Sequence, residues 1–127
     1  MPSDMRSWEH VRSLCGSSSG ELCVEQVIEG QLVLVRVVGE LDSVTSGTLN
    51  ATLVDAEAAV SPPAPVVVDL TGVSFLGVAG LSVLVDHHER CLALGSALLI
   101  VPGSRAVRRA MAVTGMHARL ALIPAPR

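Results

Sequence analysis

The stretch VVVDLTGVSFLGVAGLSVLVDHHERC, residues 66–91, decides the fold of this chain. Its first five residues, 66–70, are apolar except for Asp69 and predict a strand that is covered on both faces. Residues 77–80, Gly-Val-Ala-Gly, then form a short loop, and residues 81–94 have the pattern of a helix. A helix that starts this way points backbone N–H groups at the loop, which favours an anion. This loop, however, contains no hydroxyl group that could accept phosphate.

The sequence on either side predicts further strands and helices in alternation. Polar turns, prolines and glycines separate segments rich in Val, Leu and Ala. In chain order we expect strands at 23–28 and 32–38, a helix at 44–60, the strand at 66–70, the helix at 81–94 and a strand at 97–101. A helix at 105–114 then begins after Ser104 and ends at Gly115. Residues 120–123 form a last strand, or a short helix leading into it. A hairpin followed by this alternation predicts a single α/β domain with a mixed sheet.

Composition excludes several classes of function. The chain has 127 residues, enough for one domain with a substantial core, and 50% of them are hydrophobic. Only one Phe, one Trp and no Tyr are present, which argues against binding of single-stranded nucleic acid by base stacking. A net charge of -3 argues against a general phosphate-binding surface. The absence of lysine excludes a Walker loop and a lysine-based enzyme. We therefore expect no nucleic-acid partner and no enzymatic activity.

The first twenty residues differ in character from the rest. Residues 1–10 lack the apolar core of a signal peptide, and no apolar run in the chain is as long as a membrane span, so we expect a cytoplasmic protein. We expect residues 1–20 to be a flexible extension of a domain at 21–127, although the spacing of Trp8, Val11 and Leu14 fits a short helix. The alternative is an arm that docks on a partner or a second subunit, with Trp8 as its anchor.

Clusters of titratable residues have structural explanations. Residues 86–89, Asp-His-His-Glu, suggest metal ligation, but neighbouring residues on a helix point in different directions. We therefore expect an exposed helix face with an Asp86–Arg90 ion pair, and neither a metal nor a cofactor. Asp42 can cap the helix that follows, and Asp69 can bond nearby amides. Arginines at 105, 108 and 109 predict a solvated basic face. The three cysteines are expected as reduced thiols, with a redox switch between two of them as the alternative.

Three stretches together carry a resemblance to a known family. These are VVGELD at 37–42, VVVDLTGVSFLGVAGLSVL at 66–84 and GSALLIVPGSRAVRRAMAVTGM at 95–116. In this order and spacing they resemble the STAS domain, most closely the bacterial anti-sigma factor antagonists, over about residues 22–123. The resemblance implies a curved mixed sheet of four to five strands with three to four helices largely on one side. It also implies a non-enzymatic regulator that docks on a histidine-kinase-like anti-sigma factor and so frees a sigma factor.

The family motif shows what differs here. The resemblance implies that such antagonists are inactivated by phosphorylation of a serine in the motif Asp-Ser-Ser-Gly, which aligns with residues 77–80. Here Ala79 takes the place of the acceptor serine, and Val78 takes the place of the other serine. Only Gly80 of the motif is retained. The expected phosphoswitch is therefore absent, or relocated to Ser82 or Ser74. The resemblance places the partner-binding surface at Asp42, Ser43, Gly77, Val78, Ala79, Gly80, Leu81 and Ser82.

Two other functions and the oligomeric state stay open at this point. A stand-alone STAS subunit of a transporter or lipid-trafficking complex would have the same fold and would not need a phosphoserine. A small-ligand or redox sensor would be supported by a Cys15–Cys91 or Cys23–Cys91 disulfide. A homodimer is compatible with the sequence.

Overall fold

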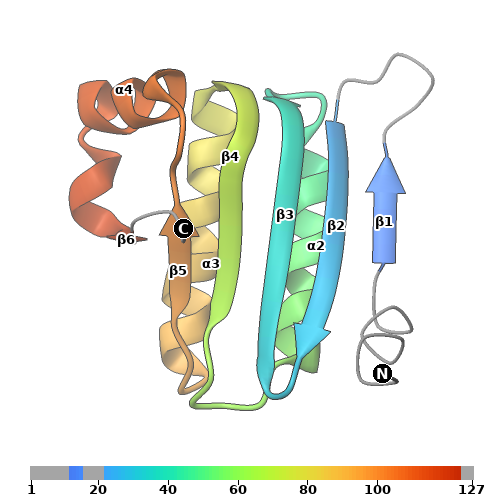
Figure 1. Ribbon diagram of the computed structural model, residues 1–127. Helices are drawn as coiled ribbons and strands as arrows, with labels where there is room; N and C mark the ends of the chain where they lie inside the picture. The colour runs from blue at the N-terminus through green and yellow to red at the C-terminus, as the bar shows by residue number, and fades with distance from the viewer. Residues whose placement is uncertain (1–11, 16–21, 124–127) are drawn as a thin grey trace.

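A computed structural model describes residues 12–15 and 22–123, which form one six-stranded sheet in the order β1-β2-β3-β4-β5-β6. Figure 1 shows the strands side by side in chain order. The elements are β1 Arg12–Cys15, β2 Leu22–Glu29, β3 Leu32–Leu41, α2 Ser46–Ala59, β4 Val66–Leu76, α3 Val78–Ala93, β5 Leu98–Val101, α4 Arg105–Thr114, the 3-10 helix η1 Met116–Arg119 and β6 Ala121–Leu122. This confirms the predicted α/β class and the mixed sheet.

Strand direction follows from the connections. β1, β2 and β3 pair antiparallel, with β2 and β3 joined by the tight turn at Gly30, where φ is 64°. β3, β4, β5 and β6 pair parallel, because a helix or helical segment connects each strand to the next. The sheet contains six strands, where four to five were expected, since residues 12–15 add β1. The short helix predicted over Trp8 to Leu14 is wrong for its described part, Arg12–Leu14, which is extended; Trp8 lies outside the described residues.

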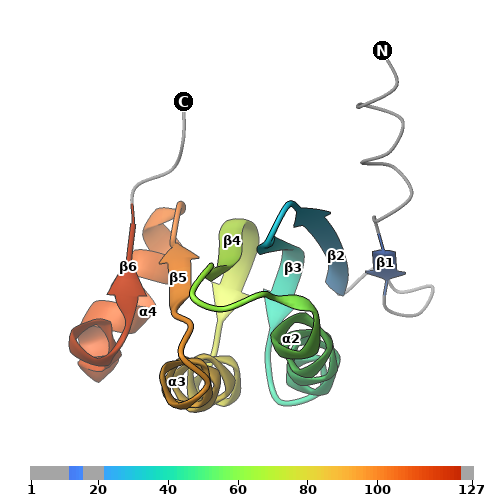
Figure 2. The ribbon, with the colours of Figure 1, turned by 90° about the horizontal axis from the view of Figure 1, so that it is seen from below.

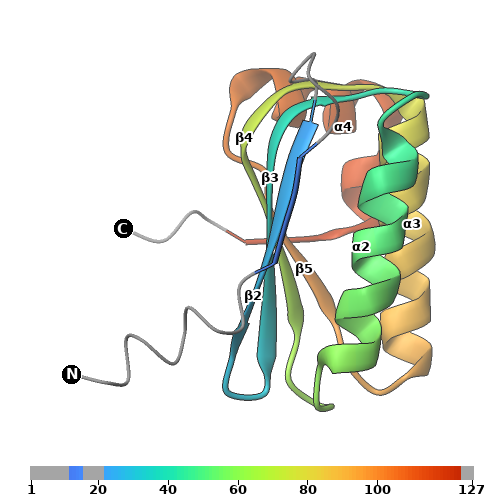
Figure 3. The same cartoon turned by 90° about the vertical axis from the view of Figure 1, so that its right-hand side faces the viewer.

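α2 and α3 lie together on one face of the sheet, as Figures 2 and 3 show. Alternate residues of the strands point into this layer, so β3 buries Val33, Val35 and Val37 completely. The helices contribute Leu49 and Leu53 from α2, and Leu81 and Leu84 from α3. Among the described residues the apolar core is therefore built mainly from Val and Leu, with Ala56, Cys91, Ile100 and Met111, and it contains no Phe or Trp.

β4 is longer than its sequence suggests. The strand was expected to stop at Leu70, but it continues through Gly72 to Leu76 beside an equally extended β3. A Cβ on Gly72 would lie 2.8 Å from Val38 Cγ2, and the register of β3 against β4 shifts near this point. β3 was expected to end at residue 38, but it continues to Leu41, and Gly39 lies within the strand with φ 122°. These glycines bend the strand pair instead of ending it.

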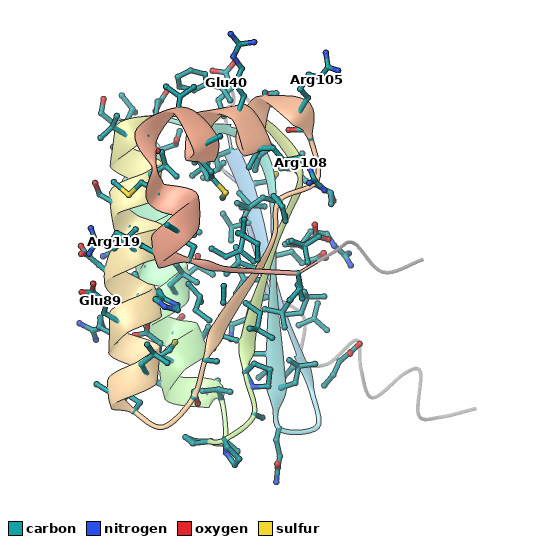
Figure 4. The ribbon with its side chains drawn as sticks, turned by 90° about the vertical axis from the view of Figure 1, so that its left-hand side faces the viewer. Glu40, Glu89, Arg105, Arg108 and Arg119 are labelled. Carbon is teal, nitrogen blue, oxygen red and sulfur yellow. The ribbon has the colours of Figure 1, made fainter. Side chains whose placement is uncertain are left out.

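α4 begins and ends at the predicted residues. Ser104 Oγ accepts a hydrogen bond from Val107 N at 3.2 Å, and Gly115 adopts a left-handed conformation with φ 76°. Val107 and Met111 are fully buried, and α4 lies across the end of the sheet (Figure 4). η1 then leads into β6. Of the two alternatives predicted for residues 120–123, the strand is therefore correct, and the helical turn comes just before that range. In the part of the chain that the structure describes, no helix has the length and apolar character needed to span a membrane.

Candidate functional site

The predicted binding residues lie at the end of the sheet where β3 and β4 stop, at the top of Figure 1. Leu41 and Leu76, the last residues of the two strands, are paired in register. Gly77 N donates to Leu41 O at 2.8 Å, which joins the loop before α3 to the loop before α2. The two loops, far apart in sequence, therefore form one surface.

Asp42 fixes the shape of the loop after β3. Its Oδ1 accepts hydrogen bonds from Val44 N and Thr45 N, both at 2.9 Å, and Thr45 Oγ1 donates to Glu40 O at 2.7 Å. These backbone bonds, above all that from Thr45, lower the pKa of the Asp42 carboxyl below its ordinary value of 3.8. α2 itself begins after Thr45, which makes no side-chain cap bond. Asp42 thus organises the turn before the helix and does not cap the helix directly.

Two glycines let α3 start close against the strand ends. Gly77 is extended, with φ −93° and ψ 178°, so its backbone does not require glycine. A Cβ there would lie 3.2 Å from Phe75 Cε2. A Cβ on Gly80 would lie 2.9 Å from Leu76 Cδ1 and 3.1 Å from Leu41 Cβ. Close packing, not backbone freedom, accounts for both glycines.

The structure divides the eight predicted partner-binding residues by exposure. Ser43, Val78 and Ser82 are exposed, and Asp42, Gly77 and Ala79 are half-buried. Gly80 and Leu81 are buried, so these two support the surface from inside and offer a partner little area. The half-buried Ala79, at the position of the family's acceptor serine, lies in the first turn of α3.

Sequence reasoning missed two exposed apolar residues of this surface. Val44 in the loop before α2 is 80% exposed, and Phe75 near the end of β4 is 51% exposed. With Val78, which is 65% exposed, they place three apolar side chains at one end of the molecule. We call Ser43, Val44, Phe75, Val78 and Ser82 the sheet-end surface. The sequence signal for Val44 was an apolar residue inside a polar turn, because a turn lies at the protein surface and its apolar side chain is then exposed.

The sheet-end surface holds little that could carry catalysis. Residues 77–80 contain no titratable side chain, and the described ranges 12–15 and 22–123 hold no group of three His, Cys, Asp or Glu that could bind a metal ion. Ser74 is exposed, with Oγ donating to Gly39 O at 3.3 Å. The arginines of α4 are exposed as predicted, and Figure 4 shows Arg105 at the same end as Glu40.

The expected exposed face at residues 86–89 is wrong for His87. This side chain is 2% exposed and lies between α2 and α3, where Nδ1 is hydrogen-bonded to Glu57 Oε2 and Nε2 lies 2.7 Å from Asn50 Oδ1. Arg90, predicted to pair with Asp86, donates instead from Nε to Glu57 Oε1 at 3.2 Å. His87 follows Leu84 by three residues and precedes Cys91 by four, a spacing that marks the buried stripe of the helix.

The expectation that the cysteines are reduced is wrong for Cys23 and correct for Cys91. Cys23 is disulfide-bonded, and the residue opposite it in the β1–β2 pair is Cys15. Cys91 is a free, buried thiol, so neither Cys15–Cys91 nor Cys23–Cys91 is a disulfide. Burial raises the pKa of the Cys91 thiol to about 11, and the nearby Glu57 carboxylate adds to the rise. Such a thiol is poorly reactive at neutral pH.

Comparison with known proteins identifies the family. A family model described as the STAS domain matches residues 24–125. The anti-sigma-F factor antagonist RsfA of Mycobacterium tuberculosis is 34% identical over 83 residues, 65% of this chain and 65% of RsfA. Rv2638 of the same species, named as an anti-anti-sigma factor, is 30% identical over 95 residues, 75% of this chain and 64% of Rv2638. The matches thus span about two-thirds of each relative's length.

Solved structures agree with this assignment. The crystal structure of an anti-sigma factor antagonist from Mycobacterium paratuberculosis superimposes with a TM-score of 0.74 and 29% sequence identity, over 88% of this chain and 92% of that one. Fold, motifs and relatives therefore lead to one conclusion: this chain belongs to the STAS domain family, and its relatives are named as anti-sigma factor antagonists.

Proposed function

We propose that this protein is a non-enzymatic regulator that binds an anti-sigma factor of the histidine-kinase-like ATPase type and so frees a sigma factor. Its relatives are named for antagonism of anti-sigma factors. The kinase-like nature of the partner is part of the proposal and rests on the resemblance to the antagonist family.

The sheet-end surface is the observation that carries this proposal. It exposes Val44, Phe75 and Val78 beside the uncharged start of α3. Exposed apolar side chains gathered at one site mark protein contact surfaces, because their burial is favourable only when a partner covers them. The two loops that carry Val44 and Val78 are tied by the Gly77–Leu41 hydrogen bond, so the surface is preformed.

We further propose that the serine switch of the family is absent at this loop. Val78 and Ala79 cannot accept phosphate, and their apolar side chains resemble the unphosphorylated, binding-competent state. A phosphoserine would add nearly two negative charges, which a partner would have to desolvate. If phosphorylation regulates the protein, it acts at Ser82 or Ser74, both exposed near the same loop.

Binding to anti-sigma kinases of the same genome tests the proposal by calorimetry. Val78→Asp should weaken binding about tenfold to hundredfold, which corresponds to about 1.4–2.8 kcal/mol. Leu92→Asp is the matched control, because Leu92 is 57% exposed and lies on the same helix about 21 Å away, after fourteen residues at 1.5 Å each. Failure to bind any such kinase, or equal effects of the two substitutions, would contradict the proposal.

Incubation with the bound kinase and ATP tests the missing switch separately. We expect no phosphate on residues 77–80 by mass spectrometry. Phosphate on Ser82 or Ser74 that disappears in the corresponding alanine variant would assign a relocated switch, whereas an unmodified chain would assign control by another route.

A further inference from the structure

One face of the sheet bears a row of apolar residues yet carries no helix among the described elements. α2 and α3 both cover the opposite face (Figure 3). The helix-free face bears Val27 of β2, Leu34 of β3, Val67 of β4 and Leu99 of β5. All four are half-buried, and they alternate along their strands with residues that are buried under the helices. Strands that are apolar on both sides are typical of sheets covered on both faces. The sequence pattern that predicted double coverage therefore indicates that something covers this face.

These residues form one unbroken row across the sheet. Val27 is paired with Leu34, Leu34 with Val67, Val67 with Leu99, and Leu99 with Ala121 of β6. Side chains at paired positions are close neighbours on one face. We call these five residues the apolar row. No charged residue interrupts it.

The charges beside the apolar row satisfy one another. Arg36 lies between Glu25 and Asp69 in the next row of paired residues. Its Nη1 is 3.3 Å from Glu25 Oε1, and its Nε is 3.7 Å from Asp69 Oδ2. Because these charges are already paired on the sheet, the apolar row favours an apolar occupant over a charged one.

The chain that precedes β1 starts next to this row. Arg12 is paired with Gln26, the neighbour of Val27. Eleven residues come before Arg12, and they include Met5, Trp8 and Val11. Four residues separate Trp8 from Arg12 and span up to about 14 Å when extended. Three strand spacings of about 4.8 Å, the distance from β1 to β4, are about the same length, so Trp8 can reach Val27, Leu34 and Val67.

We propose that residues 1–11 fold across the helix-free face and place the indole of Trp8 on the apolar row. Trp8 is the largest apolar side chain available to the chain, and a buried indole can remove more than 150 Å² from water. A segment tethered one strand away is present at an effective concentration of about millimolar, so it competes well against a second copy of the protein. This inference is independent of the proposed anti-sigma partner.

Trp8 fluorescence tests the proposal directly, because the chain has one Trp and no Tyr. We expect emission from the native full chain at shorter wavelength than from the urea-unfolded chain, with weaker quenching by acrylamide. Val67→Glu should move both properties toward their unfolded values while the circular dichroism spectrum stays folded. Val54→Glu is the control, because Val54 is 43% exposed on α2, on the other side of the sheet, and should change neither property.

Three results would overturn the proposal. Native emission equal to that of the unfolded chain would mean that Trp8 is in water, and this measurement needs no variant to fold. Protection of Trp8 that Val67→Glu leaves intact in a folded protein would place the indole elsewhere. Protection that appears only at concentrations where light scattering detects a dimer would assign the face to a second copy.

Discussion

Replacing Glu57 by Gln should destabilise the fold far more than replacing an exposed glutamate. The Glu57 and His87 side chains are 4% and 2% exposed, and their hydrogen bond joins α2 to α3. Gln keeps the size of Glu but removes the charge that faces His87 and Arg90. A hydrogen bond to a charged group contributes about 1.5–3 kcal/mol, and a buried group left without its partner adds a desolvation cost, so we expect a loss of about 3 kcal/mol. Arg90 is 60% exposed, so its own bond to Glu57 contributes no more than about 1 kcal/mol of this.

A loss of about 3 kcal/mol is large for a domain whose whole stability is about 5–15 kcal/mol. For 127 residues it corresponds to a fall in Tm of about 10–15 °C, at about 3–5 °C per kcal/mol. Urea denaturation followed by circular dichroism at 222 nm measures the free energy of unfolding, and the slope with urea should stay unchanged. Glu89→Gln is the control, because the Glu89–Arg119 pair is about 60% exposed on both sides and should contribute about 0–1 kcal/mol.

A double-mutant cycle then isolates the Glu57–His87 interaction. His87→Gln should also destabilise the protein, but the double variant should cost less than the two single losses together, with a coupling of about 1–3 kcal/mol. The reasoning fails if the two losses add, or if Glu57→Gln costs no more than Glu89→Gln.

Three further predictions concern the backbone, pH and thiol chemistry. Gly103→Ala should lower the free energy of unfolding, measured by urea denaturation, by about 2–4 kcal/mol, because φ is +73° and the new Cβ would lie 2.5 Å from Thr71 Cα. Gly47→Ala is the control: Gly47 lies in α2 with open space around it, so this change should be neutral or raise the free energy of unfolding by up to about 1 kcal/mol. A larger loss for Gly47→Ala than for Gly103→Ala would refute this reasoning. The folded state lowers the pKa of Asp42, so the stabilisation that the ionised carboxylate gives is present above pH 3.8 and is lost as the pH falls further. The urea midpoint should therefore drop less between pH 5 and pH 3 in Asp42→Asn than in the wild type. Equal drops in the two proteins would contradict this. Cys91, with its pKa raised to about 11, should resist iodoacetamide at pH 8 until urea unfolds the chain, and mass spectrometry that finds rapid labelling of the native protein would show the thiol to be accessible.

The elements that sequence predicted well carry their own local signals. α4 was predicted from Arg105 to Thr114 because Ser104 supplies a cap bond and Gly115 a left-handed turn, both of which act within a few residues. The hairpin around Gly30 is local in the same way. The family motif located the loop before α3 because strand, loop and helix follow one another directly in the chain.

What sequence missed depends on contacts between distant segments. Gly72 suggests a strand end, but β4 continues because the long β3 beside it supplies hydrogen-bond partners. His87 was assigned to a helix surface because its partner Glu57 is thirty residues away on α2. A titratable residue in the buried stripe of each helix was the available signal. The register between the two helices, which the sequence does not reveal, decides whether two such residues meet.

The short outer strands have a consequence for how this protein behaves when it is concentrated or stressed. The described sheet ends at β1 with four residues and at β6 with two, while the long valine-rich strands β3 and β4 lie at its centre. Long, flat edge strands recruit strands from other molecules, and valine-rich segments stack readily into fibrils. Here β3 lies between β2 and β4, and β4 lies between β3 and β5, so neither of these fibril-prone strands is an edge strand. Aggregation should therefore require opening of the sheet and should follow global unfolding, not precede it.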